Sequence, residues 1–585
     1  MIILPQEPLE RLRGRIARLY GETLAERLTR RFALLAGRYH PEPEWERPEG
    51  PLWDETDVVL ITYGDMVRRE GERPLRTLQR FLKRHLVDSV TTVHILPFFP
   101  YSSDDGFSVI DYRQVNRDLG TWDDVRAIGA DFDLMFDLVL NHVSSQSEWF
   151  RNYQVGLAPH RHYFIEVEPD TDLSMVVRPR TTPLLTPTHT PGGERWVWTT
   201  FSADQVDLNF ANQDVLFEFL DILLYYIEQG ARILRLDAIA YLWKQIGTPC
   251  INLPQTHEVV KLFRDVVDML APGTLLLTET NLPHAENISY FGEGDEAHMV
   301  YQFSLPPLLL HAIQFGTTRY LTQWASQLPA PPAGCTFLNF TASHDGIGVR
   351  PLEGLVPPEE IDALVERVRQ LGGLVSSRRL PDGSESPYEL NITYFDATGD
   401  PVVHDPEVHI RRFLCTQTIQ MSLQGIPGIY FHSLTATHND YFGVNQTGHN
   451  RAINRGRWAE SQLEDLLADA GSVTARVFHE YTRRLQLRAA QPAFHPDVPQ
   501  RVLPLGEGLF GVERRAEHQR IWCLNNLTQR PMEVDLASVL EPGEEAPAGG
   551  WTELLGGRAL ETRPERLSLQ PYGSAWLTVM RSPRD

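Results

Sequence analysis

Short apolar runs alternate with longer amphipathic segments from about residue 57 to about residue 430. Apolar runs of this kind predict buried parallel strands, and the segments between them predict crossover helices. The eight candidate strands are residues 58–63, 90–96, 134–140, 232–236, 274–278, 299–303, 336–340 and 426–430. This number predicts a (β/α)8 barrel, although a doubly wound open sheet would show a similar alternation.

Carboxylates follow three of these runs closely, at Asp237, Glu279 and Asp345. Catalytic groups of (β/α)8 barrels collect at the C-terminal ends of the strands, so this placement favours the barrel over the open sheet. Two carboxylates on opposite faces of a sugar can break a glycosidic bond with retention, and a third group can stabilise the charged transition state. We therefore expect the three carboxylates to meet in one active site.

Four additions to the barrel are expected, and the barrel itself is predicted to span residues 56–496. Residues 1–55 have helical spacing and predict an N-terminal helical extension. Two long excursions, at about 146–207 and about 350–405, interrupt the alternation and predict inserted loop subdomains. Short alternating strands then predict a C-terminal β-sandwich domain over residues 497–585.

Composition restricts the partners of the chain. A net charge of -23 disfavours nucleic acid and anionic membranes, which repel an acidic protein. The chain has no apolar run near the roughly 20 residues of a membrane span and no signal-peptide pattern, so we expect a cytoplasmic protein. The four cysteines are far apart and suggest neither disulfides nor a zinc site. Only three residues are lysine, so an anion site needs arginine, histidine or backbone N–H groups.

Four ordered motifs carry a family resemblance. The segments 137–142 (DLVLNH), 230–238 (GARILRLDA), 278–280 (TET) and 343–345 (SHD) resemble those of the α-amylase superfamily, glycoside hydrolase family 13. Each motif alone is a weak signal, but four in order on an eight-strand pattern are a strong one. The resemblance covers nearly all of the chain beyond residue 55.

The resemblance implies a role for each catalytic group. Asp237 matches the nucleophile that forms a covalent β-glucosyl intermediate. Arg235, two residues earlier on the same strand, would keep that carboxylate ionised and aimed. Glu279 matches the general acid and base, whose pKa should be raised by burial near Asp237. Asp345 matches the third carboxylate, which binds sugar hydroxyls and supports the transition state.

Further matches describe a subsite for one glucose rather than an open groove. His142 and His344 match histidines that hydrogen-bond glucose hydroxyls. Asp104 and Phe107 lie in a segment that resembles the part closing the glucose subsite in sucrose-phosphorylase-type enzymes, where they would bind hydroxyls and form an apolar wall. Arg455 ends a stretch that resembles the Asp-Ile-Asn-Arg pattern of the family and is another candidate for binding glucose.

Two loop segments concern the fate of the glucosyl group. Arg178 and Arg180 stand in an Arg-Pro-Arg loop that resembles the one bringing an arginine to phosphate in sucrose phosphorylases. Tyr388 resembles the tyrosine that a second loop offers to the same anion. The predicted phosphate and acceptor residues are Arg178, Arg180, Phe201, Tyr388, Glu389 and His449.

Glu389 departs from the sucrose phosphorylases, which have glutamine at this position. This argues against sucrose as the natural donor, and the loop segments 178–187, 388–391 and 448–455 look most like those of glucosylglycerate phosphorylases in the same subfamily. A carboxylate at this position would repel phosphate and glycerate alike. We therefore expect Glu389 to orient an arginine or to bind glycerate hydroxyls.

The resemblance implies a retaining glycoside phosphorylase, a glycosyltransferase that converts 2-O-α-D-glucosyl-D-glycerate and inorganic phosphate into α-D-glucose 1-phosphate and D-glycerate. Sucrose, sucrose 6-phosphate and glucosylglycerol phosphorylases stay open as alternatives. So do two other classes, an α-glucosidase and a non-catalytic sugar-binding relative. We expect no cofactor, and no metal, because no convincing cluster joins Asn141 to form the calcium site of α-amylases. A homodimer is left open.

Overall fold

The computed structural model describes residues 4–39, 50–380, 382–541, 551–560 and 565–580. Parts of three predicted regions lie outside the described residues. They are residues 1–3 and 40–49 of the N-terminal extension, residue 381 of the second insertion, and residues 542–550, 561–564 and 581–585 of the C-terminal domain.

Eight parallel strands form a closed barrel, and their order around the barrel follows their order in the chain. They are β1 (Val59–Thr62), β3 (Thr92–Ile95), β4 (Asp133–Val139), β9 (Ala231–Asp237), β10 (Leu275–Thr278), β11 (Met299–Tyr301), β12 (Thr336–Phe340) and β16 (Ile426–Tyr430). Each strand end lies within two residues of its predicted position. The barrel prediction is confirmed, and the open sheet is excluded. The strands are mostly apolar because both faces of a parallel barrel sheet are covered.

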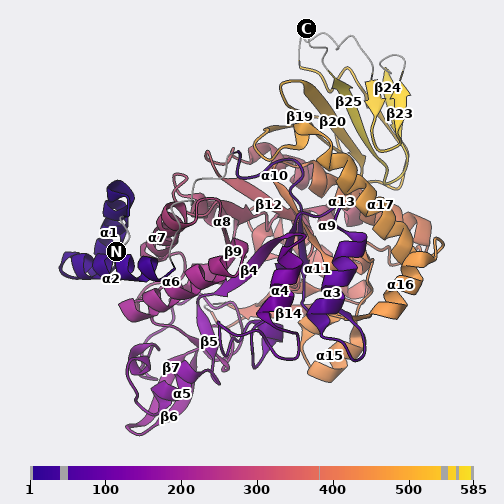
Figure 1. The fold of residues 1–585 in the computed structure, drawn as a ribbon. Coiled ribbons are helices and arrows are strands. Elements are labelled where there is room, and N and C mark those ends of the chain that lie inside the picture. The colour runs from indigo at the N-terminus through magenta and orange to yellow at the C-terminus, as the bar shows by residue number, and fades with distance from the viewer. Residues whose placement is uncertain (1–3, 40–49, 381, 542–550, 561–564, 581–585) are drawn as a thin grey trace.

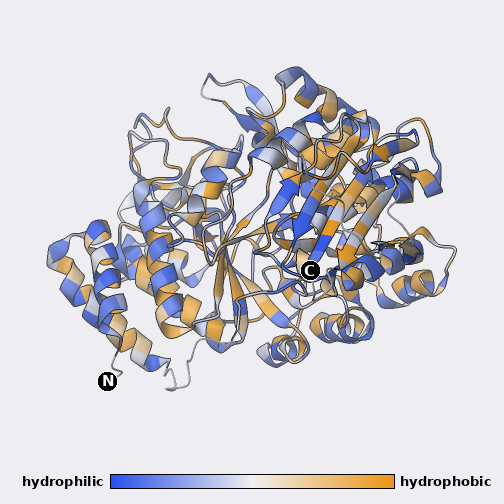
Figure 2. Ribbon diagram, turned by 90° about the horizontal axis from the view of Figure 1, so that it is seen from above, coloured by the Kyte–Doolittle hydropathy of each residue, from blue (hydrophilic) through white to orange (hydrophobic). Residues whose placement is uncertain are grey.

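Helices connect the strands and cover the outside of the barrel (Figure 1). The principal ones are α3 (Pro74–His85), α4 (Trp122–Gly129), α6 (Gln213–Glu228), α7 (Pro254–Leu270), α9 (Leu305–Phe315), α10 (Arg319–Gln327), α13 (Pro406–Ser422), α16 (Glu460–Ala468) and α17 (Val473–Ala489). Hydrophilic and hydrophobic residues alternate along the outer helices in Figure 2, as expected when one face packs on the sheet and the other meets water. Among the described residues, no helix is long and apolar enough to span a membrane.

Two N-terminal helices, α1 (Gln6–Tyr20) and α2 (Glu22–Arg38), lie beside α7 on the outside of the barrel (Figure 1). Arg11 Nε lies 2.5 Å from Asp265 Oδ1, and Arg15 Nε lies 3.3 Å from Asp265 Oδ2. Asp265 is buried, so these arginines compensate a carboxylate that would otherwise be costly to bury. Their contact ties the extension to the catalytic barrel.

Both long excursions leave the barrel at the C-terminal ends of strands, where an active site is expected. The first, after β4, contains α5 (Glu148–Gln154) and a hairpin of β6 (Leu185–Thr190) and β7 (Gly193–Trp198). The second, after β12, contains α11 (Pro358–Gln370) and an antiparallel sheet. Its strands are β13 (Ile347–Gly348), β14 (Leu374–Arg379) and β15 (Glu385–Asn391).

The C-terminal part of the chain forms a larger and a smaller antiparallel sheet. The larger contains β18 (Gln500–Val502), β19 (Leu509–Arg515), β20 (Gln519–Asn526), β25 (Ser574–Met580), β22 (Trp551–Glu553) and β23 (Arg558–Leu560). The smaller pairs β21 (Met532–Asp535) with β24 (Arg566–Leu569). Residues of both sheets share one apolar core, in which the Trp522 and Trp551 rings stack 5.0 Å apart. Trp576 Nε1 donates to Ser422 Oγ at 3.1 Å, which connects this part to α13.

Candidate active site

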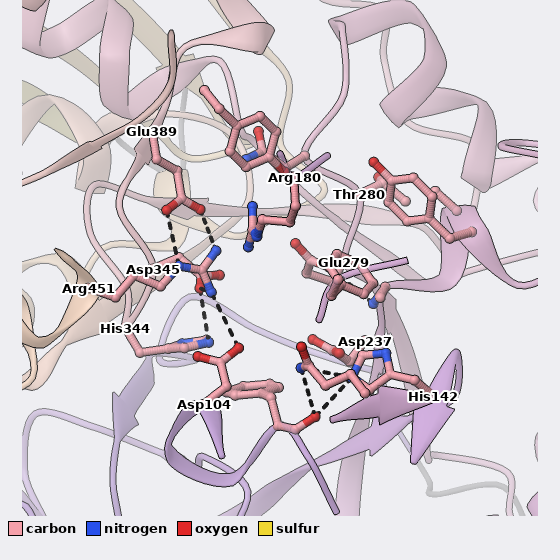
Figure 3. Close-up of a pocket in the computed structure, with 18 of the residues that line it drawn as sticks. Asp104, His142, Arg180, Asp237, Glu279, Thr280, His344, Asp345, Glu389 and Arg451 are labelled. Atoms are coloured by element: carbon pink, nitrogen blue, oxygen red, sulfur yellow. Dashed lines mark hydrogen bonds and ion pairs between the residues drawn. The ribbon is translucent and has the colours of Figure 1, made fainter. Parts of the chain in front are cut away.

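A pocket that is open to solvent at its mouth lies where the barrel strands end (Figure 3). Its lining brings together most of the residues predicted from the sequence. These are Asp104, Phe107, His142, Arg180, Phe201, Asp237, Glu279, His344, Asp345, Tyr388 and Glu389. Segments more than 280 residues apart in the chain therefore meet in one site, as the barrel topology requires.

The three carboxylates come from the ends of three strands. Asp237 is the last residue of β9, Glu279 follows β10 directly, and Asp345 lies beyond β12. Ala238, just after Asp237, has a left-handed φ of 56°. This conformation is uncommon for a residue with a side chain. The backbone N–H of Ala238 donates to Glu279 Oε2 at 3.1 Å, so the turn joins the two carboxylates.

Arg235 holds Asp237 from inside the barrel. Its Nη1 lies 2.6 Å from Asp237 Oδ1 and 2.5 Å from Asp137 Oδ1, and Asp137 Oδ2 lies 2.7 Å from His94 Nε2. Asp137 stands opposite Arg235 in the register of β4 and β9. Sequence reasoning gave no role to Asp137 or His94. A charged residue inside an apolar strand was the available signal, because a buried charge needs a partner.

Protonation differs between the two central carboxyls. Burial raises the pKa of Asp237, the charge of Arg235 opposes this rise, and the charge of Glu279 adds to it. Burial and the charge of Asp345 raise the pKa of Glu279. Asp237 accepts a hydrogen bond from Arg235, whereas Glu279 accepts one from a backbone N–H, and charge-assisted bonds stabilise the ionised form more. The ion pair with Arg235 therefore favours the ionised form of Asp237, and we expect the proton that the pair shares to lie on Glu279.

Arg451 connects Asp345 to Glu389. Its Nη1 lies 2.6 Å from Asp345 Oδ1, and its Nε donates to Glu389 Oε2 at 3.0 Å (Figure 3). Burial alone would raise the pKa of Asp345, but Arg451, His344 and Arg455 lower it strongly. We expected Glu389 either to orient an arginine or to bind glycerate hydroxyls. In the structure its carboxylate binds Arg451. The family pattern marks only Arg455 in this stretch, so the motif does not reveal Arg451.

A tight turn presents Asp104 to the pocket. Asp104 and Asp105 both have left-handed φ values, 51° and 46°, and Gly106 follows with φ 115°. A Cβ at Gly106 would fall 2.5 Å from the carbonyl oxygen of Pro97, so this turn requires glycine. Arg455 Nη1 holds the turn, at 3.2 Å from Asp104 Oδ1 and 2.9 Å from Asp105 Oδ2.

Aromatic and imidazole rings line the same end of the pocket. The Phe107 ring stacks on His344 with centroids 4.6 Å apart, and the guanidinium carbon of Arg235 lies 5.6 Å from the Phe107 ring centroid. Burial lowers the pKa of His344 to about 3, so its imidazole is neutral near pH 7. His142 Nε2 lies 2.9 Å from the carbonyl oxygen of Phe107 and donates to it.

Asn141 accepts a hydrogen bond from the ammonium group of Lys244. Lys244 Nζ lies 2.5 Å from Asn141 Oδ1 and 2.6 Å from Asp207 Oδ2. Asn141 and Asp207 are buried, and the Lys244 side chain is 3% exposed. Asp207 Oδ1 also accepts the backbone N–H of Thr200 at 2.8 Å. The charge that compensates Asp207 therefore comes from lysine. Within the described ranges, no group of three His, Cys, Asp or Glu side chains is arranged to hold a metal ion.

A β-bulge shapes the opposite end of the pocket. In the β14–β15 pair, Ser376 faces Glu389 and Ser377 faces Pro387, so Tyr388 is an extra residue without a partner in the ladder. Neighbouring side chains of a regular strand point to opposite faces, and a bulge can re-aim one of them. Tyr388 and Glu389 both line the pocket for this reason.

Arg180 lies between two aromatic rings at this end. Its guanidinium carbon is 5.7 Å from the Phe201 ring centroid and 5.1 Å from that of Tyr388. In the view of Figure 3, Arg180 reaches into the pocket between Glu389 and Glu279. Among the described residues, no carboxylate forms an ion pair with Arg180.

Four predicted site residues do not line the pocket. Arg235 and Arg455 lie behind it and bind its carboxylates, as described above. Arg178 donates to the carbonyl oxygen of Thr182 within its own loop. His449 is exposed at the start of the short helix η6 (Asn450–Asn454). Lining residues that sequence reasoning did not select are Gln205, Tyr241, Thr280, Asn281 and Arg451.

Comparisons with known proteins agree with this geometry. The family model described as "Alpha amylase, catalytic domain" matches residues 87–329. The glucosylglycerate phosphorylase of Spirochaeta thermophila is 48% identical over 98% of this chain and 99% of its own length. That of Escherichia coli is 45% identical over 82% of this chain and 92% of its own. The crystal structure of sucrose 6F-phosphate phosphorylase from Thermoanaerobacter thermosaccharolyticum has a TM-score of 0.71, 26% identity, and coverage of 81% of this chain and 94% of that one. The chain therefore belongs to the α-amylase family, glycoside hydrolase family 13, in its sucrose-phosphorylase-type subfamily.

Proposed function

We propose that this protein is a retaining phosphorylase that converts 2-O-α-D-glucosyl-D-glycerate and phosphate into α-D-glucose 1-phosphate and D-glycerate. The observation that carries the proposal is Arg180, a guanidinium that lines the pocket beside Glu279 and has no ion-pair partner in the described chain. An unpaired arginine at this place suits an oxyanion acceptor. Relatives that cover nearly the whole chain are named glucosylglycerate phosphorylases, which supports the choice.

The first half-reaction uses the two central carboxyls. An oxygen of Asp237 attacks C1 of the glucosyl group, while Glu279 gives its proton to the 2-oxygen of the leaving glycerate. The bond from C1 to glycerate breaks, and an ester bond from C1 to Asp237 forms with inversion. Arg235 keeps Asp237 ionised for this attack, through the 2.6 Å contact between them.

The second half-reaction reverses these roles. An oxygen of phosphate attacks C1, its proton passes to Glu279, and the bond from C1 to Asp237 breaks. A second inversion restores the α configuration, which gives α-D-glucose 1-phosphate and returns both carboxyls to their starting states. Arg180 and Tyr388 would receive the charged oxygens of phosphate, and glycerate would use the same place in the first half-reaction.

The glucose end of the pocket would hold the transferred sugar. Asp104 and Asp345 would accept hydrogen bonds from glucose hydroxyls, and neutral His344 would donate a further bond. His142 would donate to a hydroxyl in place of its bond to the carbonyl oxygen of Phe107. Phe107 would cover the apolar face of the ring. Asp345 stays ionised because Arg451 and Arg455 lower its pKa, so its charge can stabilise the oxocarbenium-like transition state.

Two further proposals concern location and partners. All four cysteines are free and buried, which suits a reducing compartment, and we propose a cytoplasmic protein. The proposed partners are small molecules: the α-glucoside, phosphate, glucose 1-phosphate and glycerate. A homodimer remains open.

An acceptor panel tests the proposed function. The protein is supplied with glucose 1-phosphate and, in turn, D-glycerate, fructose, glycerol or fructose 6-phosphate, and phosphate release is measured. We expect release with D-glycerate to exceed that with the other three by at least about tenfold. Equal release with any of them would overturn the proposal. Formation of free glucose instead of glucose 1-phosphate from the glucoside in phosphate buffer would identify an α-glucosidase.

A further inference from the structure

Two arginines, Arg350 and Arg378, lie behind the acceptor end of the pocket. Among the described residues, only one carboxylate compensates their two positive charges. Arg350 begins the short helix η5 (Arg350–Leu352) and is only 8% exposed. Arg378 lies on β14, and its side chain is 14% exposed. Among the described residues, the only ion pair of either one joins Arg378 Nη2 to Glu353 Oε1 at 2.5 Å. The buried Nε atoms of both arginines lack a hydrogen-bond partner within those residues.

The chain leading to Arg350 lies against the wall of the pocket. A Cβ at Gly348 would fall 2.5 Å from Oδ1 of Asn281, which lines the pocket. The next residue, Val349, donates its backbone N–H to the carbonyl oxygen of Tyr388 at 3.1 Å. Arg350 therefore starts directly behind Tyr388.

Arg378 reaches the same region from the neighbouring strand. It pairs with Ser386 in the β14–β15 ladder, two residues before Tyr388. Burial lowers the pKa of Arg378, and repulsion from Arg350 lowers it further. Burial raises the pKa of the Tyr241 and Tyr388 phenols, and the charge of Arg350 opposes this rise at both. Because these phenols line the pocket, the charge of Arg350 acts on its acceptor end.

The two acceptors of the proposed reaction carry their charge at different depths. In phosphate, the charged oxygens share one phosphorus atom with the attacking oxygen. In glycerate, the carboxylate lies one carbon further from the attacking 2-hydroxyl. Arg180 lines the pocket and can meet either anion. Arg350 and Arg378 do not line the pocket, and their layer behind Tyr388 suits the more distant charge of glycerate.

We propose that Arg350, supported by Arg378, binds the carboxylate of the acceptor and thereby selects D-glycerate over uncharged polyols of similar size. A buried cation without an anion is unfavourable, and the carboxylate would supply the missing partner. The inference rests on the proposed function and adds the residues that choose the acceptor.

The test uses α-D-glucosyl fluoride as donor, so that no phosphate is present, and compares D-glycerate with glycerol as acceptors. The proteins are the wild type, Arg350→Met, and the control Arg379→Met, which removes an exposed arginine next to Arg378. We expect Arg350→Met to raise the KM for D-glycerate at least about 30-fold, as expected when a buried charge loses its partner. Transfer to glycerol and fluoride release without acceptor should stay within about twofold of wild type. The control should change none of these values.

Three results would overturn the inference. Equal losses with D-glycerate and glycerol would mean that Arg350 only supports the strand that carries Tyr388. In a second assay with phosphate as the acceptor of glucosyl fluoride, a higher KM for phosphate with an unchanged KM for glycerate would assign the arginines to phosphate. An unchanged KM for glycerate in a variant that folds would remove Arg350 from acceptor binding. If Arg350→Met does not fold, Arg378→Met gives the same comparison.

The wild-type arm separates this inference from the proposed function. If the wild type transfers no glucose to D-glycerate, the proposed function fails. If the wild type transfers glucose to D-glycerate and the arginine variants do so equally well, only the inference about Arg350 and Arg378 fails.

Discussion

At the glucose end of the pocket, Arg235, Arg451 and Arg455 each form an ion pair with a carboxylate. By contrast, Arg180 at the acceptor end and Arg350 behind it have no carboxylate partner among the described residues. The first set lies on or behind the ends of barrel strands, and the second lies on the two inserted excursions. A subsite with balanced charges suits an uncharged sugar that stays in place through both half-reactions. A subsite with unbalanced positive charge suits acceptors that bring their own negative charge and leave with it.

The largest expected effect comes from removing the nucleophile at the balanced end. Asp237→Asn should lower phosphorolysis of glucosylglycerate by about 10⁴-fold or more, because no covalent intermediate can form. Glucose 1-phosphate release measures the loss, and the thermal unfolding midpoint shows whether the fold is kept.

Glu279→Gln is the matched control for this variant. With α-D-glucosyl fluoride the leaving group needs little protonation, so Glu279→Gln should still form the glucosyl enzyme, and an added azide ion should accept the glucose. Asp237→Asn should give neither product. If Asp237→Asn kept substantial activity with the fluoride, the assignment of the nucleophile would be wrong.

The second effect tests the pairing inside the barrel. Asp137→Asn removes one of the two carboxylates on Arg235 and leaves the other, Asp237, to hold the guanidinium alone. We expect kcat/KM to fall by about 100-fold, because a small displacement of the nucleophile has an effect of this size. The pH profile should shift as well, since Arg235 sets the ionisation of Asp237. A fall in activity with an unchanged pH profile would indicate a purely structural role.

The barrel and its catalytic ends were predictable from the sequence, because buried parallel strands give continuous apolar runs and the motifs follow them. From the sequence, Asp137 could be identified only as a charged residue inside an apolar run. Its partner Arg235 follows from the register of β4 and β9. The contact between Arg451 and Glu389 was not predictable, since it joins the short helix η6 to strand β15, 62 residues apart in the chain. The bulge at Tyr388 was not predictable for a similar reason, because it is defined by the pairing of β15 with β14.

The third effect concerns Lys244, whose ammonium compensates Asp207 beneath the glucose end. Lys244→Met would leave the Asp207 carboxylate buried without a compensating positive charge, so the free energy of unfolding should fall by about 3 kcal/mol. Lys83→Met is the control: Lys83 pairs with Asp131 at 2.7 Å, but its side chain is 60% exposed. An exposed pair of this kind contributes less than about 1 kcal/mol. Urea unfolding of both variants makes the comparison, and equal losses would contradict the buried compensation.

The fourth effect is a pH dependence of stability. Burial lowers the pKa of His432 to about 4, below the unfolded value of about 6.5. The unfolded chain therefore binds more protons between these values, and stability is lost as the pH falls below about 6.5. His432→Gln can keep the bond to the carbonyl oxygen of Gly456 without titrating. Between pH 7 and pH 5 the wild type should lose about 2 kcal/mol more than this variant. Parallel losses would exclude His432 as a source of acid sensitivity.

The smallest effect lies where the two ends of the pocket meet, at Glu389. Its carboxylate holds Arg451, which also pairs with Asp345, so one arginine joins the acceptor loop to the glucose subsite. Glu389→Gln keeps a hydrogen-bonding side chain but removes the charge, and the KM values for D-glycerate and phosphate should each change by about tenfold. Fluoride release from glucosyl fluoride should change much less, because Asp345 still holds Arg451 beside the glucose. Glu385→Gln, an exposed residue of the same strand, is the control. If the donor reaction fell as much as acceptor binding, the ends would act as one unit, and the distinction between balanced and unbalanced charge would not hold.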